Sequence, residues 1–178
     1  MRVIAGRAKG VRLSPVPPGT RPVSDMAREG LFASLGSLVE GARVLDLWAG
    51  SGALAIEALS RGAAEATLVD RGNAPVAAIR ENLRRTRTEA RVVRGDARRF
   101  LPPAGEIPFD LVFLDPPYEE GPETLDPVLE RLAGGLPSGA TVVLTRGRRS
   151  STPVIPLDLA VARRLEYGDT LVLVCRKA

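Results

Sequence analysis

Residues 44–52 read Val-Leu-Asp-Leu-Trp-Ala-Gly-Ser-Gly and decide the fold. The stretch Val44–Trp48 is apolar apart from Asp46 and predicts a buried strand. Two glycines then lead directly into an alanine-rich helix, which we expect over Ala53–Leu59 and ended by Gly62. Because glycine has no Cβ, backbone N–H groups at such a turn can approach a ligand closely. The stretch therefore predicts a βα unit with a ligand site at its turn.

The same alternation continues along the chain and predicts the α/β class. Further helices are expected from the N-cap Ser24 to about Val39, over Pro75–Leu83 and over Thr124–Leu132. Further strands are expected at Ala66–Val69, Arg91–Val93, Leu111–Leu114 and Thr141–Leu144, with a terminal pair at Leu159–Leu165 and Thr170–Val174 turned by Tyr167–Asp169. Strands alternating with helices imply a parallel sheet covered on both faces, and such sheets bind ligands beyond the carboxyl ends of their strands.

Acidic side chains stand near the carboxyl ends of four of these strands: Asp46, Asp70, Asp96 and Asp115. At the carboxyl ends of strands, Asp70 can accept both hydroxyls of a ribose, and Asp96 can accept an adenine amine. A dinucleotide dehydrogenase is disfavoured, because the glycine turn lacks a third glycine at the usual spacing and no histidine or lysine lies nearby. S-adenosylmethionine fits better, since it offers adenine, a ribose diol and an amino acid but no pyrophosphate.

The last of these acids begins the motif Asp115-Pro116-Pro117-Tyr118. Each proline fixes its own φ and lacks an N–H, so the turn is stiff and the carbonyls of Asp115 and Pro116 stay free to accept. An acceptor cluster beside an aromatic ring suits the exocyclic amine of a nucleobase, which can donate two hydrogens while the base stacks on Tyr118. Alone, the tetrapeptide could equally be an ordinary strand-ending turn.

Composition indicates one globular domain of 178 residues with 44% apolar content. No apolar stretch is long enough to span a bilayer and no signal peptide is recognisable, so we expect a cytoplasmic protein. The single cysteine, Cys175, lies in an apolar run; we interpret it as a buried strand residue and expect no disulfide and no metal site. The absence of histidine leaves carboxylates and backbone groups to perform any chemistry.

The net charge of +4 is carried almost wholly by arginine, which favours a nucleic-acid partner, although a GC-rich genome or a hot habitat would also enrich it. Positive residues crowd the first segment, where glycines and prolines predict a short strand or hairpin followed by an irregular loop. Those considered for contact with RNA are Arg7, Lys9, Arg12 and Arg21. A second cluster spans Arg146–Arg149. Either cluster could also be a solvated loop.

The chain resembles the bacterial 16S rRNA guanine-N2 methyltransferases of the RsmD type, over nearly its whole length. The resemblance rests on Asp115–Tyr118 and on Val3–Gly6, Arg21–Asp25 with Arg28 and Glu29, Val44–Gly52, Glu57–Ala63 and Tyr167–Thr170. It implies a Rossmann-like class I methyltransferase fold: a mostly parallel seven-stranded sheet with an antiparallel C-terminal strand, helices on both faces and a short N-terminal basic extension. The implied domains are a basic arm at 1–23 and a methyltransferase domain at 24–178.

The resemblance also implies an activity and a site. The cofactor would be S-adenosylmethionine, bound by Asp46, Ala49, Gly50, Gly52, Asp70 and Asp96, and the target base would be held by Asp115, Pro116, Pro117 and Tyr118. The methyl acceptor would be the exocyclic N2 of a guanine in 16S rRNA, either as naked RNA or within the 30S subunit. We expect the enzyme to act as a monomer. Two positions depart from the family pattern: Trp48 replaces a usual phenylalanine, and Thr145-Arg146 stands where many relatives carry an acid.

Three other functions are compatible with these residues. An adenine-N6 methyltransferase acting on DNA or RNA would use the same motif, and only the resemblance of the N-terminal block argues against it. A noncatalytic RNA-binding module would need the basic surface but not the row of strand-end acids. A small-molecule methyltransferase would not need the arginine-rich arm.

Overall fold

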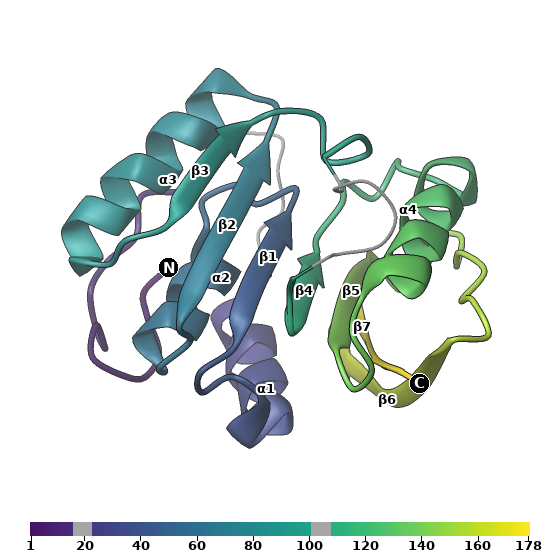
Figure 1. The fold of residues 1–178 in the computed structure, drawn as a ribbon. Coiled ribbons are helices and arrows are strands. Elements are labelled where there is room, and N and C mark those ends of the chain that lie inside the picture. The colour runs from purple at the N-terminus through teal and green to yellow at the C-terminus, as the bar shows by residue number, and fades with distance from the viewer. Residues whose placement is uncertain (16–22, 101–107) are drawn as a thin grey trace.

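A single sheet organises the protein (Figure 1), whose computed structural model describes residues 1–15, 23–100 and 108–178. The strand order is β3-β2-β1-β4-β5-β7-β6. The strands are β1 (Arg43–Leu47), β2 (Glu65–Asp70), β3 (Arg91–Arg94), β4 (Leu111–Leu114), β5 (Thr141–Gly147), β6 (Leu159–Tyr167) and β7 (Thr170–Lys177). The prediction of a seven-stranded sheet is confirmed.

Strand direction and order place a crevice beside β1. Strands β1 to β5 pair in parallel, whereas β7 runs antiparallel to both β5 and β6, as predicted for the C-terminal strand. Strand β1 lies between β2 and β4, so the order of strands reverses there. The loops after β1 and β4 therefore diverge, which leaves room for a ligand at the carboxyl ends of these two strands.

Helices cover both faces of the sheet, as predicted. They are α1 (Asp25–Leu35), α2 (Ala53–Ser60), α3 (Asn73–Thr86) and α4 (Pro122–Gly135). Apolar residues of α1, α2 and α3 share one core cluster, and those of α4 belong to the cluster on the opposite face. In Figure 1, α1 and α2 lie behind the strands and α4 lies in front of β5. None of the helices in the described ranges is long and apolar enough to cross a membrane.

Helix α1 begins where the sequence predicts and ends earlier. The Ser24 side chain accepts a hydrogen bond from the Ala27 N–H at 3.1 Å, which confirms the predicted N-cap. The helix ends at Leu35 because Gly36 adopts a φ of 53°, and a short 3-10 helix, η1 (Gly36–Leu38), follows. The predicted extension to Val39 is therefore wrong, and Leu38 is partly exposed rather than part of the buried face.

The N-terminal segment forms the predicted hairpin, closed by a bridge between Arg2 and Arg12. Its backbone is fixed by hydrogen bonds from the Val3 N–H to the Val11 carbonyl at 3.0 Å and from the Gly10 N–H to the Val3 carbonyl at 2.9 Å. Three apolar side chains of this hairpin are buried in the main core: Val3, Ala8 and Leu13. The described part of the predicted arm is therefore packed against the sheet domain.

Polar groups of α2 hold the hairpin in place. The buried Glu57 carboxylate accepts the N–H groups of Ile4 and Ala5 at 2.8 and 3.0 Å. Gly6 has a φ of 80°, and a Cβ at this position would lie 1.8 Å from the Ser60 carbonyl oxygen. Only glycine allows this approach, so the turn and the C-terminal end of α2 fit together without space for a side chain.

We predict that Glu57→Ala lowers the free energy of unfolding by about 3 to 5 kcal/mol, measured by urea denaturation. The substitution removes a carboxylate that lies 2.7 Å from the Nε of Arg61 and 3.8 Å from the Nη1 of the fully buried Arg28. The same carboxylate accepts two backbone N–H groups, which would lose their acceptor. Glu81→Ala is the matched control, because Glu81 pairs only with exposed arginines on α3. Equal unfolding midpoints for the two variants would contradict this role of Glu57.

Candidate active site

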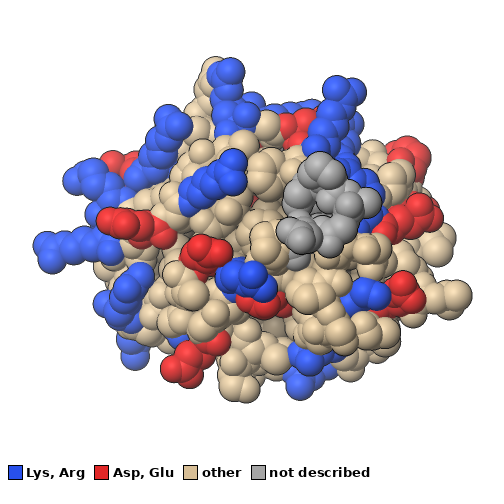
Figure 2. Space-filling view, in the orientation of Figure 1, with Lys and Arg blue, Asp and Glu red and all other residues tan. Residues whose placement is uncertain are grey.

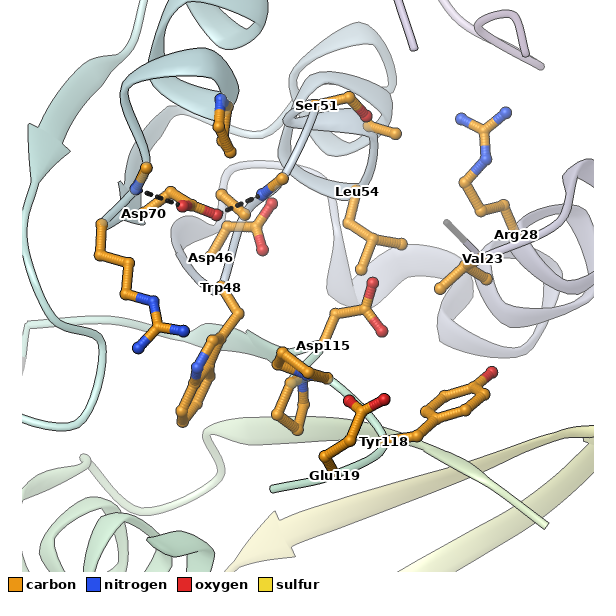
Figure 3. Close-up of a pocket in the computed structure, with 18 residues that line it drawn as sticks. Val23, Arg28, Asp46, Trp48, Ser51, Leu54, Asp70, Asp115, Tyr118 and Glu119 are labelled. Atoms are coloured by element: carbon orange, nitrogen blue, oxygen red, sulfur yellow. Dashed lines mark hydrogen bonds between the residues drawn. The ribbon is translucent and has the colours of Figure 1, made fainter. Parts of the chain in front are cut away.

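A pocket of about 340 Å³ opens at the carboxyl ends of β1, β2 and β4 (Figure 3). Its volume lies in the range of small-molecule sites. The predicted site residues that line it are Asp46, Ala49, Gly50, Asp70, Asp115, Pro116, Pro117 and Tyr118. The topology thus brings together most of the strand-end acids and the whole Asp-Pro-Pro-Tyr motif.

Asp46 is a buried carboxylate at the floor of this pocket. It stands in β1 and is 1% exposed. Its Oδ2 accepts the Ala55 N–H of the first turn of α2 at 3.2 Å, whereas its Oδ1 is buried without a hydrogen-bond partner. Burial raises the pKa of Asp46 well above its usual range, and the nearby Asp115 raises it further. An unpaired buried acceptor of this kind suits a cationic hydrogen-bond donor on a ligand.

Asp115 points into the same space from the adjacent strand. Its residue follows β4, and its N–H donates to the Leu47 carbonyl at 3.3 Å. Figure 3 shows the carboxylates of Asp46 and Asp115 directed into the pocket between Asp70 and Tyr118. Burial raises the pKa of Asp115 to about 6, although the Thr145 hydroxyl, which donates to its Oδ1, lowers it. Burial thus raises the pKa values of both acids, which favours their neutral forms when no ligand is bound.

Asp70 joins two of the loops that border the pocket. Its carboxylate accepts the Gly50 N–H and the Gly72 N–H, each at 2.9 Å (Figure 3). The bonds fix the turn after β1 against the turn after β2. Each carboxylate oxygen can accept more than one hydrogen bond, so Asp70 keeps acceptor capacity for a hydroxyl pair.

The turn after β1 has the left-handed geometry that its glycines permit. Gly50 and Gly52 have φ values of 57° and 78°, and a Cβ on Gly52 would lie 2.8 Å from the Leu68 side chain. Gly52 is the N-cap of α2 and does not line the pocket, so its predicted contact with the cofactor stays a prediction. Trp48, the single tryptophan, lines the pocket with a φ of 59°, rare for a bulky residue.

The motif after β4 forms a compact turn. The Pro117 carbonyl accepts the Glu120 N–H at 3.0 Å, and the Tyr118 carbonyl accepts the Ser150 hydroxyl at 3.3 Å. The Tyr118 ring lies over Gly147, where a Cβ would be 3.1 Å from its Cδ2. The ring therefore depends on a glycine in β5 for its position at the pocket wall.

Asp96 lies outside the pocket lining. Its carboxylate accepts the N–H of Arg98 at 3.0 Å and the guanidinium Nε of the same residue at 2.9 Å, which lowers the pKa of Asp96. Its predicted contact with adenine stays a prediction.

The described basic residues among those predicted to bind RNA do not line the pocket. Arg7, Lys9 and Arg12 are exposed on the N-terminal hairpin, and Arg21 lies outside the described residues. The hairpin sits at the C-terminal end of α2, and the N-terminal end of α2 borders the pocket. An eight-residue helix rises about 12 Å, so the basic hairpin lies roughly one short helix away from the candidate site.

Three other residues near the site are not among those predicted from the sequence to form it. Arg28 lines the pocket and is fully buried; its Nη2 donates to the Arg2 carbonyl at 2.6 Å and to Asp25 at 2.7 Å. Thr145 contacts Asp115, and Arg146 is buried although the sequence places it in a basic cluster. The sequence features that could have indicated them are the Arg28-Glu29 pair in the N-terminal block and Thr145-Arg146 at the end of the fifth predicted strand, where many relatives carry an acid.

The groups of this pocket fit S-adenosylmethionine. The unpaired Oδ1 of Asp46 can accept an ammonium group, Asp70 can accept a hydroxyl pair, and two buried carboxylates favour a cation such as a sulfonium. In the residues that the structure describes, no cluster of three His, Cys, Asp or Glu side chains could hold a metal ion. The pocket is thus equipped for an organic cation.

Comparisons with known proteins agree with this geometry. The chain is 38% identical to "Putative rRNA methyltransferase YlbH" of Bacillus subtilis, over 99% of both chains. It is also 38% identical to "Ribosomal RNA small subunit methyltransferase D" of Escherichia coli, over 95% of this chain and 86% of that protein. The solved structure titled "Putative methyltransferase yhhF from Escherichia coli" superimposes with a TM-score of 0.86 and 35% identity, covering 99% of this chain and 97% of the other.

A family profile described as "Conserved hypothetical protein 95" matches residues 1–176. The match spans the hairpin, the pocket and the C-terminal strands, so it covers every feature on which the predicted resemblance depends. The class I methyltransferase fold is confirmed, and the chain belongs to the family of conserved hypothetical protein 95, the RsmD-type family predicted from its sequence.

Proposed function

We propose that this protein transfers a methyl group from S-adenosylmethionine to the exocyclic N2 of a guanine in 16S rRNA of the small ribosomal subunit. The observation that carries the proposal is that Asp115 and Tyr118 both line one pocket, whose buried acids suit a cationic cofactor. Support for the RNA class comes from the name of the E. coli relative, which is a small-subunit rRNA methyltransferase.

The proposed cofactor contacts follow from the unpaired groups of the pocket. Asp46 would accept the ammonium of the methionine part through its free Oδ1, and Asp70 would accept the ribose hydroxyls. The turn at Ala49 and Gly50 would approach the cofactor with backbone atoms. When bound, S-adenosylmethionine supplies an electrophilic methyl group on a sulfonium sulfur. The pocket then needs only to bring a nucleophilic nitrogen to that methyl in line.

The motif turn would prepare the amine for attack. The lone pair of the guanine amine is delocalised into the ring, which makes it a poor nucleophile. Asp115 and the Pro116 carbonyl would accept its two hydrogens and favour a tetrahedral nitrogen, while the flipped base stacks on Tyr118. With the cofactor bound, the new N–C bond would replace the C–S bond, whose electron pair would remain on sulfur. The methylated nitrogen then loses a proton, which Asp115 can accept.

The basic hairpin would bind RNA phosphates. Arg7, Lys9 and Arg12 are exposed, and no acidic side chain of the described chain forms an ion pair with them. Figure 2 shows basic side chains projecting from the rim of the face that carries α3 and β3. Contacts of this kind position an RNA without reading its sequence, so the base itself would be selected in the pocket. The role of Arg21 is proposed by analogy with its neighbours.

The test of the function is transfer of labelled methyl from S-adenosylmethionine to small-subunit particles and to naked 16S rRNA from a strain that lacks this gene. Mass spectrometry of the nucleosides should identify N2-methylguanosine. N6-methyladenosine would instead support the adenine-specific alternative, and label in no RNA would refute the proposed substrate class.

Replacement of Asp115 should separate chemistry from cofactor binding. We expect Asp115→Asn to lower kcat by about 100-fold or more, because a neutral amide presents a donor where the carboxylate oxygen accepts. Cofactor affinity should change by less than about 10-fold, measured by the fluorescence of Trp48, the single tryptophan in the pocket. Asp126→Asn on α4 is the control, since Asp126 does not line the pocket and its carboxylate accepts the Val154 N–H at 3.0 Å. A normal kcat in Asp115→Asn would refute the mechanism.

The raised pKa of Asp115 predicts a pH dependence. Below pH 6 the carboxyl is mostly protonated in the free enzyme and is a weaker acceptor for the amine hydrogen and for the released proton, so kcat/KM should rise with pH and level off above about 7. In the cofactor complex the midpoint should be lower, because the positive charge of the cofactor favours the carboxylate. A rate that falls as pH rises from 5 to 7 would contradict the role of an ionised Asp115.

A further inference from the structure

Arg146 is a buried cation that the mechanism above does not use. It stands in β5, where it pairs with Leu171 of β7, and it is 1% exposed. Among the described residues no carboxylate forms an ion pair with it. Burial lowers the pKa of Arg146, which shows the cost of removing its guanidinium from water. Hydrogen bonds from the guanidinium must therefore offset the free energy of its desolvation.

Those hydrogen bonds all go to backbone carbonyls on two loops. The Nη1 of Arg146 donates to the Pro117 carbonyl at 3.3 Å, and its Nη2 lies 2.7 Å from the Glu120 carbonyl oxygen. The same Nη2 lies 3.5 Å from the carbonyl oxygen of Tyr118 and 3.4 Å from that of Ser151. The first three acceptors belong to the motif turn, and the fourth belongs to the loop after β5. One guanidinium therefore connects both loops.

The motif turn lacks donors of its own for this purpose. Pro116 and Pro117 have no N–H, so the turn cannot extend the hydrogen-bonded ladder of β4. An arginine offers five N–H donors in a fixed planar arrangement, which a lysine does not. The neighbouring residue Thr145 contacts the Asp115 carboxylate, and Gly147 makes room for the Tyr118 ring. Three successive residues of β5 thus support the turn.

We propose that Arg146 is a positioning residue that fixes the Asp115–Tyr118 turn, and with it the plane of the Tyr118 ring, for the incoming base. The inference rests on the proposed role of this turn in holding the target base. Arg146 acts through backbone carbonyls and does not line the pocket. Its removal should therefore affect the chemical step and leave cofactor binding intact.

Kinetics of Arg146→Lys and Arg146→Met test this role, with Arg176→Met as the matched control. Arg176 lies on β7 at the opposite end of β5, where its Nη1 donates to Thr141 at 3.3 Å. We expect both Arg146 variants to lose about 10- to 100-fold in kcat, because a misplacement near 1 Å has an effect of this size. Cofactor affinity, read from Trp48 fluorescence, should change by less than about 3-fold, and Arg176→Met should have a normal kcat.

Hydrogen exchange provides a readout that does not depend on activity. The Glu120 amide, bonded to the Pro117 carbonyl, should exchange at least about 10-fold faster in both Arg146 variants, while amides of β1 and β4 keep their protection. Unchanged exchange in this turn, or a lower melting temperature with normal kcat, would overturn the proposal. If Arg146→Met does not fold, the kcat and the Glu120 amide exchange of Arg146→Lys decide whether the proposal holds. If the wild type methylates no RNA, the proposed function fails and the exchange experiment still tests the contact.

Discussion

The structure depends on two carboxylates that are held close together without a cation. Asp46 and Asp115 stand at the carboxyl ends of β1 and β4, which pair in parallel, and both have raised pKa values because they are buried. Their protein partners are neutral: the Ala55 N–H for one and the Thr145 hydroxyl for the other. Neither carboxylate forms an ion pair among the described residues, so the pair favours a ligand that carries positive charge.

Two rigid supports keep this arrangement in place. On one side, the N-terminal hairpin is fixed to α2 through Glu57, and the first turn of α2 donates to Asp46. On the other side, β5 presents Thr145 and Arg146 to the motif turn. Both supports use buried charged side chains: Arg146 donates to backbone carbonyls, and Glu57 accepts two backbone N–H groups and pairs with Arg61 and Arg28. Such groups fix loop geometry in one arrangement, because each lost bond leaves a buried polar atom unpaired.

Much of this could be predicted from the sequence, because periodicity and punctuation are local signals. The apolar run that begins at Val44 predicts the first strand. The glycine turn after it and the proline pair at Pro116 predict the two loops that border the pocket. The predicted first strand includes Trp48. In the structure β1 ends at Leu47, and Trp48 begins the turn with a positive φ. Gly36 ended α1 earlier than its apolar pattern suggested, because a left-handed residue overrides that pattern.

Nonlocal contacts were not visible in the same way. Arg146 stands in a basic cluster, and arginine is rarely buried, so nothing in the local pattern indicated a role inside the sheet. The burial of Val3, Ala8 and Leu13 follows no helical or strand period, since it arises from a turn seated on α2. Asp96 follows its strand as expected, and its carboxylate accepts hydrogen bonds from Arg98, a local pairing two residues along the chain that strand periodicity does not indicate.

Calorimetry of cofactor binding tests the central claim most directly. Binding of S-adenosylmethionine should be measured at pH 6 in buffers of different ionisation enthalpy, with the uncharged-sulfur product S-adenosylhomocysteine as the comparison. If the Asp46 and Asp115 pair is held for a cation, the sulfonium compound releases up to about one proton and binds more tightly, and the release decreases by pH 8. Equal affinity for both compounds, with no proton released by either, would contradict the account.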